Sequence, residues 1–179
     1  MTVNPMNLGG MNVLVTGASS GLGRASAVLM SQLGARVLLV GRNPERLQET
    51  LELLDGQGHQ SLAFDLGDVA AIAAMLDQQA ASFGRFDGVV HAAGILSTRP
   101  LRVSNPDVFE SIYRINVVAA GQLLRGITKR SVVGDSGCSV VLVGSVTSSV
   151  GVPGLAAYAA SKSAILGLMR SAALELAPS

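Results

Sequence analysis

Short apolar runs alternate along the chain with longer segments in which apolar residues recur every three or four positions. The short runs predict strands at 13–15, 36–40, 62–65, 86–91 and 139–143. The periodic segments predict helices at 22–33, 44–54, 69–83, 106–129 and 156–177. Because the strands are nearly continuous runs of Val and Leu, both faces of their sheet should be buried. Five successive strand–helix units predict an α/β fold, a doubly wound parallel sheet in three α/β/α layers.

The chain has 179 residues, which is the size of one domain, and no linker divides the predicted units. Residues 1–10 hold neither a basic segment nor an apolar run, so they read as a loose leader without the features of a secretory signal. Residues 11–179 form the predicted domain. No stretch approaches the roughly 18 apolar residues of a membrane span, so no membrane partner is expected.

The composition indicates a packed protein that handles small molecules. Apolar residues make up 49% of the chain and charged residues 14%, against about 25% charged in typical domains. The net charge of +1, without a basic stripe, argues against a nucleic-acid partner. The single Cys138 cannot form an internal disulfide, and it lies too far from His59 and His91 for a local metal motif, so we expect no metal and a cytoplasmic location. His91 is expected to pack at a strand end and His59 to be solvated.

A glycine-rich loop, Thr16-Gly17-Ala18-Ser19-Ser20-Gly21-Leu22-Gly23, joins the first predicted strand to the first predicted helix. Such a loop presents backbone N–H groups and a helix N-terminus to a phosphate. The spacing G-x-x-x-G-x-G departs from the common G-x-G-x-x-G. The alternative interpretation is a tight turn that uses glycine for positive φ.

The end of the second strand indicates which dinucleotide the loop would bind. An acidic residue there binds the 2′-hydroxyl of NAD, whereas an arginine accommodates the 2′-phosphate of NADP. This chain has no acid at that place, and Arg42 follows Gly41 directly. NADP is therefore favoured over NAD. Arg42 could instead be a solvated residue at a helix start, although a cation there opposes the helix dipole.

Ser145, Tyr158 and Lys162 are the candidate catalytic residues. Tyr158 and Lys162 stand four positions apart, so they share one face of the last predicted helix. A phenol of ordinary pKa, about 10, is a poor acid–base catalyst at neutral pH, and a lysine ammonium beside it would favour the phenolate. Ser145 could donate a hydrogen bond to a substrate oxygen. A tyrosine–lysine pair can also be no more than a surface pair.

Taken together, these motifs resemble the short-chain dehydrogenase/reductase family in its classical branch, from about Gly10 to the end of the chain. The shared features are the glycine loop, Asp65 after the third strand, Ala93-Gly94 after the fourth, Asn116 in the middle helix, Ser145, and Tyr158-x-x-x-Lys162. The resemblance implies an NAD(P)-binding Rossmann-like domain and an NADP(H)-dependent oxidoreductase that acts on a carbonyl or secondary alcohol, such as a ketone or 3-oxoacyl substrate. A dinucleotide-binding regulatory or scaffold protein with little turnover is the alternative.

The resemblance also implies roles for individual residues. Tyr158 would be the acid–base, Ser145 would hold the substrate oxygen, Lys162 would lower the tyrosine pKa and bind the ribose, and Asn116 would hold a relay water. Asn116 could equally be a buried side chain bonded to backbone, and both readings can hold together. The cofactor would contact Gly17, Ser19, Ser20, Gly21, Leu22, Gly23, Arg42, Asp65, Leu66, Ala93, Gly94, Tyr158 and Lys162.

Two departures from the family qualify the resemblance. Ala92 stands where the family often has an asparagine that stabilises the strand. Family members also continue into further strands and a substrate lid, so we expect the sequence to be incomplete and the strand at 139–143 to form an unguarded sheet edge. The resemblance further implies a homodimer or homotetramer that packs through the middle and last helices.

Overall fold

The structure is a computed structural model that describes residues 6–177. Its strands are β1 (Asn12–Thr16), β2 (Arg36–Gly41), β3 (Gln60–Ala63), β4 (Gly88–His91) and β5 (Ser139–Leu142). Its α-helices are α1 (Gly21–Gln32), α2 (Pro44–Leu51), α3 (Ile72–Phe83), α4 (Pro106–Tyr113), α5 (Ala119–Gly126) and α6 (Ala156–Leu176). Two 3₁₀ turns, η1 (Leu101–Val103) and η3 (Val146–Ser148), and a π-helical turn, η2 (Arg114–Val118), complete the elements.

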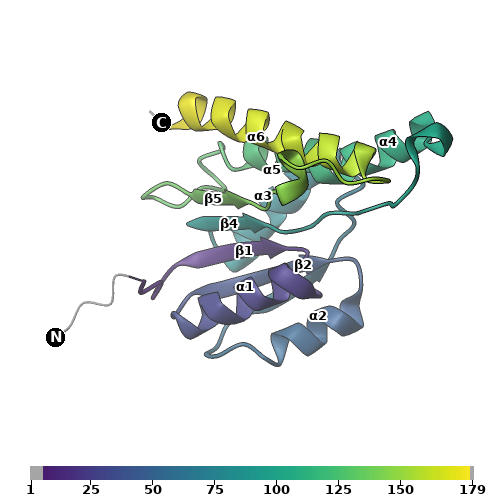
Figure 1. Ribbon diagram of the computed structural model, residues 1–179. Helices are drawn as coiled ribbons and strands as arrows, with labels where there is room; N and C mark the ends of the chain where they lie inside the picture. Colours follow the sequence, from purple (N-terminus) through teal and green to yellow (C-terminus); the bar gives the residue numbers. More distant parts are fainter. Residues whose placement is uncertain (1–5, 178–179) are drawn as a thin grey trace.

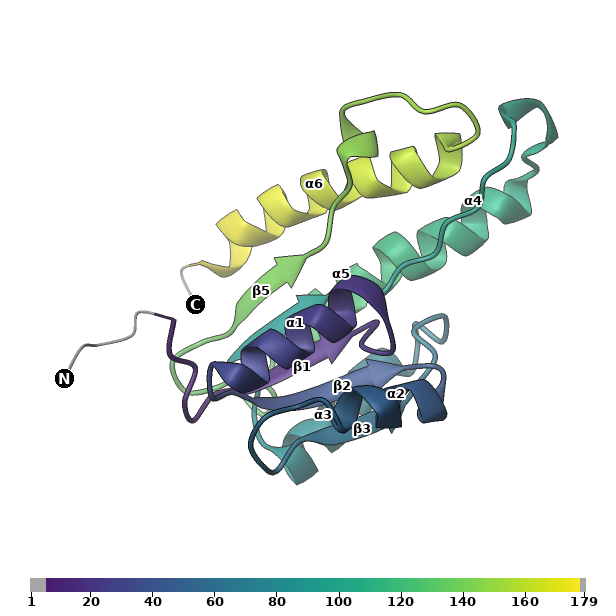
Figure 2. The same cartoon turned by 60° about the horizontal axis from the view of Figure 1, so that its bottom comes forward.

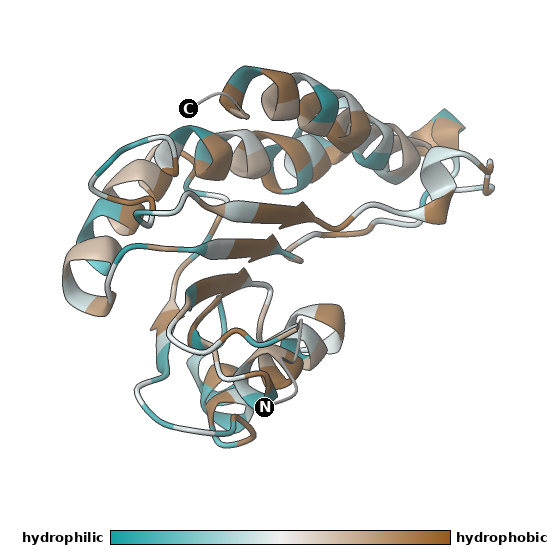
Figure 3. Ribbon diagram, turned by 90° about the vertical axis from the view of Figure 1, so that its left-hand side faces the viewer, coloured by the Kyte–Doolittle hydropathy of each residue, from teal (hydrophilic) through white to brown (hydrophobic). Residues whose placement is uncertain are grey.

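The five strands form one parallel sheet in the order β3-β2-β1-β4-β5, covered by helices on both faces. In Figure 1, α1 and α2 cover one face, while α3, α5 and α6 lie on the other. Side chains along β1 alternate between two apolar clusters: Leu14 packs with α3 and α5, and Val13 packs with α1 and α2. Figure 3 shows the strands as a mostly hydrophobic central layer. The predicted doubly wound, three-layer fold is confirmed.

The connectivity of the sheet creates a crevice beside β1. From β1 the chain builds outward to β2 and β3, then returns to add β4 and β5 on the other side. The loops that follow β1 and β4 therefore leave the sheet in opposite directions at the carboxyl ends of neighbouring strands, and ligands bind at such a switch point in doubly wound sheets.

Several predicted boundaries shift in the structure. The third strand is Gln60–Ala63 rather than 62–65, since its pairing with β2 runs from Leu38 opposite Gln60 to Gly41 opposite Ala63. The helix predicted at 69–83 begins at Ile72. The long helix predicted at 106–129 is instead α4, η2 and α5, and it ends at Gly126.

The described part of the predicted leader contacts the domain. The N–H of Leu8 donates to the carbonyl of Leu33 at 2.8 Å, and the Leu8 side chain packs against the apolar cluster between the sheet and α1. Residues 1–5 of that leader lie outside the described residues. Within 6–177, no helix combines the length and the apolar character needed to cross a membrane.

The expectation for His59 is wrong. Its Nδ1 accepts a hydrogen bond from the N–H of Val37 at 3.0 Å, which leaves Nε2 to donate to the carbonyl of Asp55 at 2.8 Å. The imidazole is partly buried and ties the loop before β3 to β2. It is a structural side chain rather than a solvated one.

Candidate active site

A cleft of about 470 Å³ opens at the carboxyl ends of the strands. Its walls come from the loops after all five strands and from the first turns of α6. Every residue that the sequence predicts to bind a cofactor lines it: Gly17, Ser19, Ser20, Gly21, Leu22, Gly23, Arg42, Asp65, Leu66, Ala93, Gly94, Tyr158 and Lys162. The sequence analysis missed other lining residues, among them Arg46, Phe64, Ile95, Leu96 and Ile115.

The glycines after β1 allow the loop to pack closely at two points and to stay open at a third. Gly17 has a φ of 68°, and a Cβ there would lie 2.7 Å from the backbone nitrogen of Ala93. A Cβ on Gly23 would overlap the carbonyl of Gly17. Gly21, where α1 begins, has no atom within 4 Å of its Cβ position. The loop therefore holds α1 close to the sheet and leaves space at the helix start.

The N-terminus of α1 is suited to an anion. Ser20 occupies the position before the helix, but its side chain makes no capping hydrogen bond, and the first turn holds no acidic residue. The first N–H groups of a helix have no partner within the helix, and the helix dipole adds positive potential there. A phosphate group matches both features.

Two arginines carry positive charge on the wall beside β2. Arg42 and Arg46 are exposed side chains that line the cleft. The Asn43 side chain accepts the N–H of Arg46 at 2.7 Å and so caps α2, with Pro44 in the first turn. The cap fixes where α2 starts, and therefore the backbone positions from which the Arg42 and Arg46 side chains extend.

Tyr158 and Lys162 lie on one face of α6 at the opposite wall. Lys162 is buried, and its Nζ donates to the carbonyl of Val143 at 2.7 Å. Burial lowers the pKa of Lys162 below its usual value. Its Nζ is 5.9 Å from the centre of the Tyr158 ring. A Cβ on Gly94 would lie 3.5 Å from that Nζ, so the backbone of the loop after β4 passes close to the ammonium group in the cleft.

Ser145 comes directly after Val143 and Gly144, which line the cleft, but Ser145 itself does not line it. It lies after the end of β5, since that strand stops at Leu142, and it caps the turn η3. Its Oγ accepts hydrogen bonds from the N–H of Thr147 at 3.2 Å and from the Thr147 hydroxyl at 2.8 Å. Because Oγ accepts both bonds, its own proton is available to another acceptor. Thr147 belongs to none of the sequence motifs, so its hydrogen bonds to Ser145 could not be predicted from the sequence.

Asn116 lies behind the cleft, in the π-helical turn η2. Its buried Oδ1 accepts the N–H of Ile95 at 2.8 Å, while Nδ2 donates to the Ile95 carbonyl at 3.1 Å and to Ser161 Oγ at 3.0 Å. A Cβ on Gly94 would lie 3.2 Å from Oδ1. The amide thus fixes the loop after β4 against α6, which is the structural interpretation of this residue. The water relay that the family resemblance implies for Asn116 stays a prediction.

A second, larger hollow lies away from these groups. It has a volume of about 690 Å³ between β5, α5 and the C-terminal half of α6, and its lining includes Leu124, Cys138 and Met169. Burial first, and the Asp87 carboxylate second, raise the pKa of the Cys138 thiol to about 11. Among residues 6–177, no group of three or more His, Cys, Asp or Glu side chains could hold a metal ion. The polar groups suited to chemistry gather at the smaller cleft.

Comparison with known proteins agrees with this geometry. The family model for short chain dehydrogenases matches residues 11–179. An uncharacterized oxidoreductase of Thermotoga maritima is 34% identical over 95% of this chain and 67% of its own length. A 3-oxoacyl-acyl-carrier-protein reductase of Escherichia coli is 31% identical over 96% of this chain and 70% of its own length. The chain thus spans about two thirds of the length of these curated relatives.

Solved structures share the fold over nearly the whole chain. A short chain dehydrogenase from Shigella flexneri superposes with a TM-score of 0.86 at 32% identity, over 96% of this chain and 69% of that one. Another from Shigella flexneri, complexed with NADP, has a TM-score of 0.83 at 32% identity and matches 96% of this chain and 74% of its own.

Proposed function

The chain belongs to the short-chain dehydrogenase family, a family of oxidoreductases, and from this premise we propose that it transfers a hydride between NADP(H) and a carbonyl or secondary alcohol. The observation that carries the proposal is the shared cleft: the glycine loop, Arg42, and the pair Tyr158 and Lys162 line one cavity although they are far apart in sequence. One wall is suited to phosphate and the other to acid–base chemistry.

Three features of the cleft fit a phosphorylated dinucleotide. The open space at Gly21 and the α1 N-terminus suit a diphosphate. Arg42 and Arg46 offer charge-assisted hydrogen bonds to a 2′-phosphate. Gly94 and the Lys162 ammonium lie close together on the cleft wall, where a nicotinamide ribose would find a hydrogen-bond donor. When bound, NADPH supplies the hydride for carbonyl reduction, and NADP⁺ accepts it in the reverse direction.

The side chains of the opposite wall supply the proton. In the direction of reduction, the Tyr158 hydroxyl donates its proton to the substrate oxygen as that oxygen gains negative charge. The Lys162 ammonium, held by the Val143 carbonyl, stabilises the resulting phenolate through its charge. The Ser145 hydroxyl, steadied by Thr147, donates a hydrogen bond to the same substrate oxygen.

The substrate class follows from the site and from the relatives. A site that combines a hydride donor with a phenol and a serine hydroxyl suits an uncharged carbonyl. One relative is named as a 3-oxoacyl-acyl-carrier-protein reductase, and its substrate carries such a group. We therefore propose a ketone or a 3-oxoacyl thioester.

Because the chain spans about two thirds of the length of its relatives, the catalytic proposal is tested on the complete protein, by following the oxidation of NADPH with a panel of ketones and 3-oxoacyl thioesters. Tyr158→Phe removes only the acid–base hydroxyl and should lower kcat about 10²–10⁴-fold. The variant should still bind NADPH, because its ring is retained. NADPH binding combined with a turnover that Tyr158→Phe leaves unchanged would contradict the catalytic role, and binding without any turnover would favour the regulatory alternative.

The cofactor proposal is tested by comparing NADPH and NADH affinities. Arg42→Ala should weaken NADPH binding about tenfold or more, the scale of one lost charge-assisted hydrogen bond, and should change NADH binding little. Arg170→Ala, which removes an exposed arginine on α6, is the matched control. Equal losses for both cofactors in Arg42→Ala would refute the specificity argument.

A further inference from the structure

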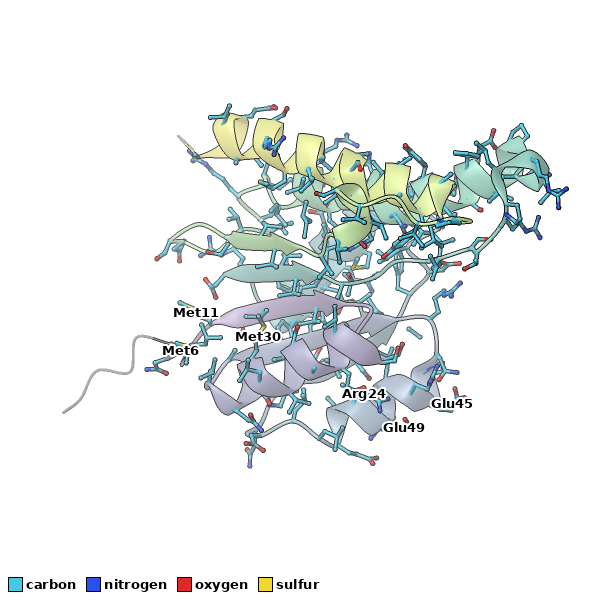
Figure 4. The ribbon with its side chains drawn as sticks, in the orientation of Figure 1. Met6, Met11, Arg24, Met30, Glu45 and Glu49 are labelled. Atoms are coloured by element: carbon cyan, nitrogen blue, oxygen red, sulfur yellow. The ribbon has the colours of Figure 1, made fainter. Side chains whose placement is uncertain are left out.

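The side chain of Arg24, in the first turn of α1, makes hydrogen bonds both to the glycine loop and to α2. Its side chain is 28% exposed and does not line the cleft. Its Nε donates to Thr50 Oγ1 at 2.9 Å, and its Nη2 donates to the carbonyls of Ser19 at 2.8 Å and Arg46 at 3.3 Å. The same Nη2 pairs with the Glu49 carboxylate at 3.0 Å. In Figure 4, Arg24 and Glu49 lie next to each other between α1 and α2.

Thr50 completes this connection from the side of α2. It is fully buried, and its hydroxyl lies 2.9 Å from the carbonyl of Ala18 and 3.0 Å from the carbonyl of Arg46. Since the hydroxyl also accepts from Arg24, two side chains join the consecutive carbonyls of Ala18 and Ser19 to one turn of α2. We call this group, Arg24 with Thr50, the loop clamp.

The loop clamp orients the glycine loop. In a trans peptide the C=O and N–H groups point in opposite directions. With the Ala18 and Ser19 carbonyls bonded toward α2, the N–H groups of Ser19 and Ser20 are directed to the other side of the loop. The Glu49 carboxylate offsets the charge of Arg24, so the contribution of Arg24 is geometric rather than a free positive charge.

The loop clamp also fixes the distance between two walls of the cleft. Both clamp side chains contact the carbonyl of Arg46, the residue whose own side chain lines the cleft together with Arg42. The first turn of α2, which carries Arg46 and follows Arg42 closely in the chain, is therefore bonded directly to the loop that is suited to a diphosphate. A ligand with phosphate groups at both places needs both walls at the right separation.

We propose that Arg24 and Thr50 are positioning residues that set the preference for NADPH over NADH. The proposal rests on the proposed function, since it assumes that the cleft binds a dinucleotide. A ligand without the 2′-phosphate would contact the glycine loop but not Arg42 and Arg46. Its affinity therefore depends less on the distance between the loop and the two arginines. Loss of the loop clamp therefore penalises the phosphorylated cofactor more.

The test is a pair of substitutions at one buried site. Thr50→Val keeps the shape and removes the hydroxyl, whereas Thr50→Ser keeps the hydroxyl and serves as the matched control. NADPH and NADH are each titrated against the chain and followed by nicotinamide fluorescence, and urea unfolding of each cofactor-free variant is measured alongside. Thr50→Val should raise the Kd for NADPH about tenfold and that for NADH less than about threefold, while Thr50→Ser stays close to wild type.

Arg24→Lys gives a second, independent variant that keeps the charge. One ammonium group cannot reach Thr50, Ser19 and Arg46 together as the guanidinium does, so the same selective loss of NADPH affinity is expected. Equal weakening of both cofactors in these variants, or an unchanged ratio of affinities, would overturn the positioning role and leave the proposed function intact. A wild-type chain that binds neither cofactor would overturn both.

Discussion

His91 is a buried side chain that connects the ends of β4 and β1 beside the cleft. It ends β4 and is 3% exposed, and its Nδ1 is 2.8 Å from Thr16 Oγ1. Thr16 Oγ1 also accepts the N–H of Ala93 at 3.3 Å, so the threonine hydroxyl joins the imidazole to the loop after β4. Within residues 6–177, Nε2 has no hydrogen-bond partner. Burial, and then the charge of Lys162, lower the pKa of His91 to about 4.

This pKa predicts a stability that falls in mild acid. The unfolded chain protonates His91 near pH 6.5, whereas the folded chain resists protonation until about pH 4. The unfolded state therefore binds more protons between these values, and this residue should cost roughly 3 kcal/mol of stability as the pH falls from 6.5 to 4. Urea unfolding at a series of pH values measures the effect. His91→Asn, which cannot titrate, should show a shallower decline, and equal declines would contradict the assignment.

Sequence reasoning found the residues at strand ends more readily than the residues that support them. Gly17, Arg42, Asp65 and Gly94 each follow an apolar run, and the carboxyl ends of parallel strands must meet at one edge of the sheet. The roles of Arg24 and His59 depend instead on groups that only the fold brings near, the Arg46 carbonyl and the Val37 N–H. No local pattern contains that information.

At the scale of elements, the π-helical turn between α4 and α5 is the main departure from the predicted helix. The pattern of residues 106–129 is continuous, but η2 adds a wider turn and presents the Asn116 amide to Ile95 and Ser161. Such turns are often found at functional sites. Periodicity alone could not reveal this turn, because its stabilising partners belong to the loop after β4 and to α6.

Removal of the Asn116 amide should loosen the loop after β4. Asn116→Leu leaves the N–H and carbonyl of Ile95 without their partner and should cost about 2–5 kcal/mol of unfolding free energy. Hydrogen exchange at the Ile95 amide should become faster. Ser161→Ala, which breaks one of the three Asn116 bonds and the bond from Ser161 Oγ to the Tyr158 carbonyl, is the control and should cost about 1–2 kcal/mol. Equal losses in the two variants would show that the amide does not hold this loop.

At the scale of the whole molecule, the sheet formed by residues 6–177 is open at β5. In the described residues β5 pairs only with β4, and Figure 2 shows it at the edge, with α6 alongside. Val141 lies opposite Val90 in register, yet Val90 is buried and Val141 is 52% exposed. The unguarded edge predicted from the sequence is therefore present, and such edges pair with other chains.

We predict that this edge promotes self-association of the chain. The apparent mass from light scattering should rise with concentration for the wild type and rise much less for Val141→Lys, because a charge on an exposed edge opposes strand pairing. Leu174→Glu, at an exposed position of α6, tests the helix surface instead. If only Leu174→Glu reduces association, the contact runs through α6 and not through the edge.

The central claim is that the smaller cleft, and not the larger hollow beside β5, binds the cofactor. Hydrogen–deuterium exchange of the chain with and without saturating NADPH tests this claim directly. NADPH bound in the smaller cleft should slow exchange in the glycine loop at 17–23 and after β4 at 93–95, with no change around Cys138 and Met169. Protection confined to the hollow that Cys138 and Met169 line, or none in the glycine loop, would contradict it.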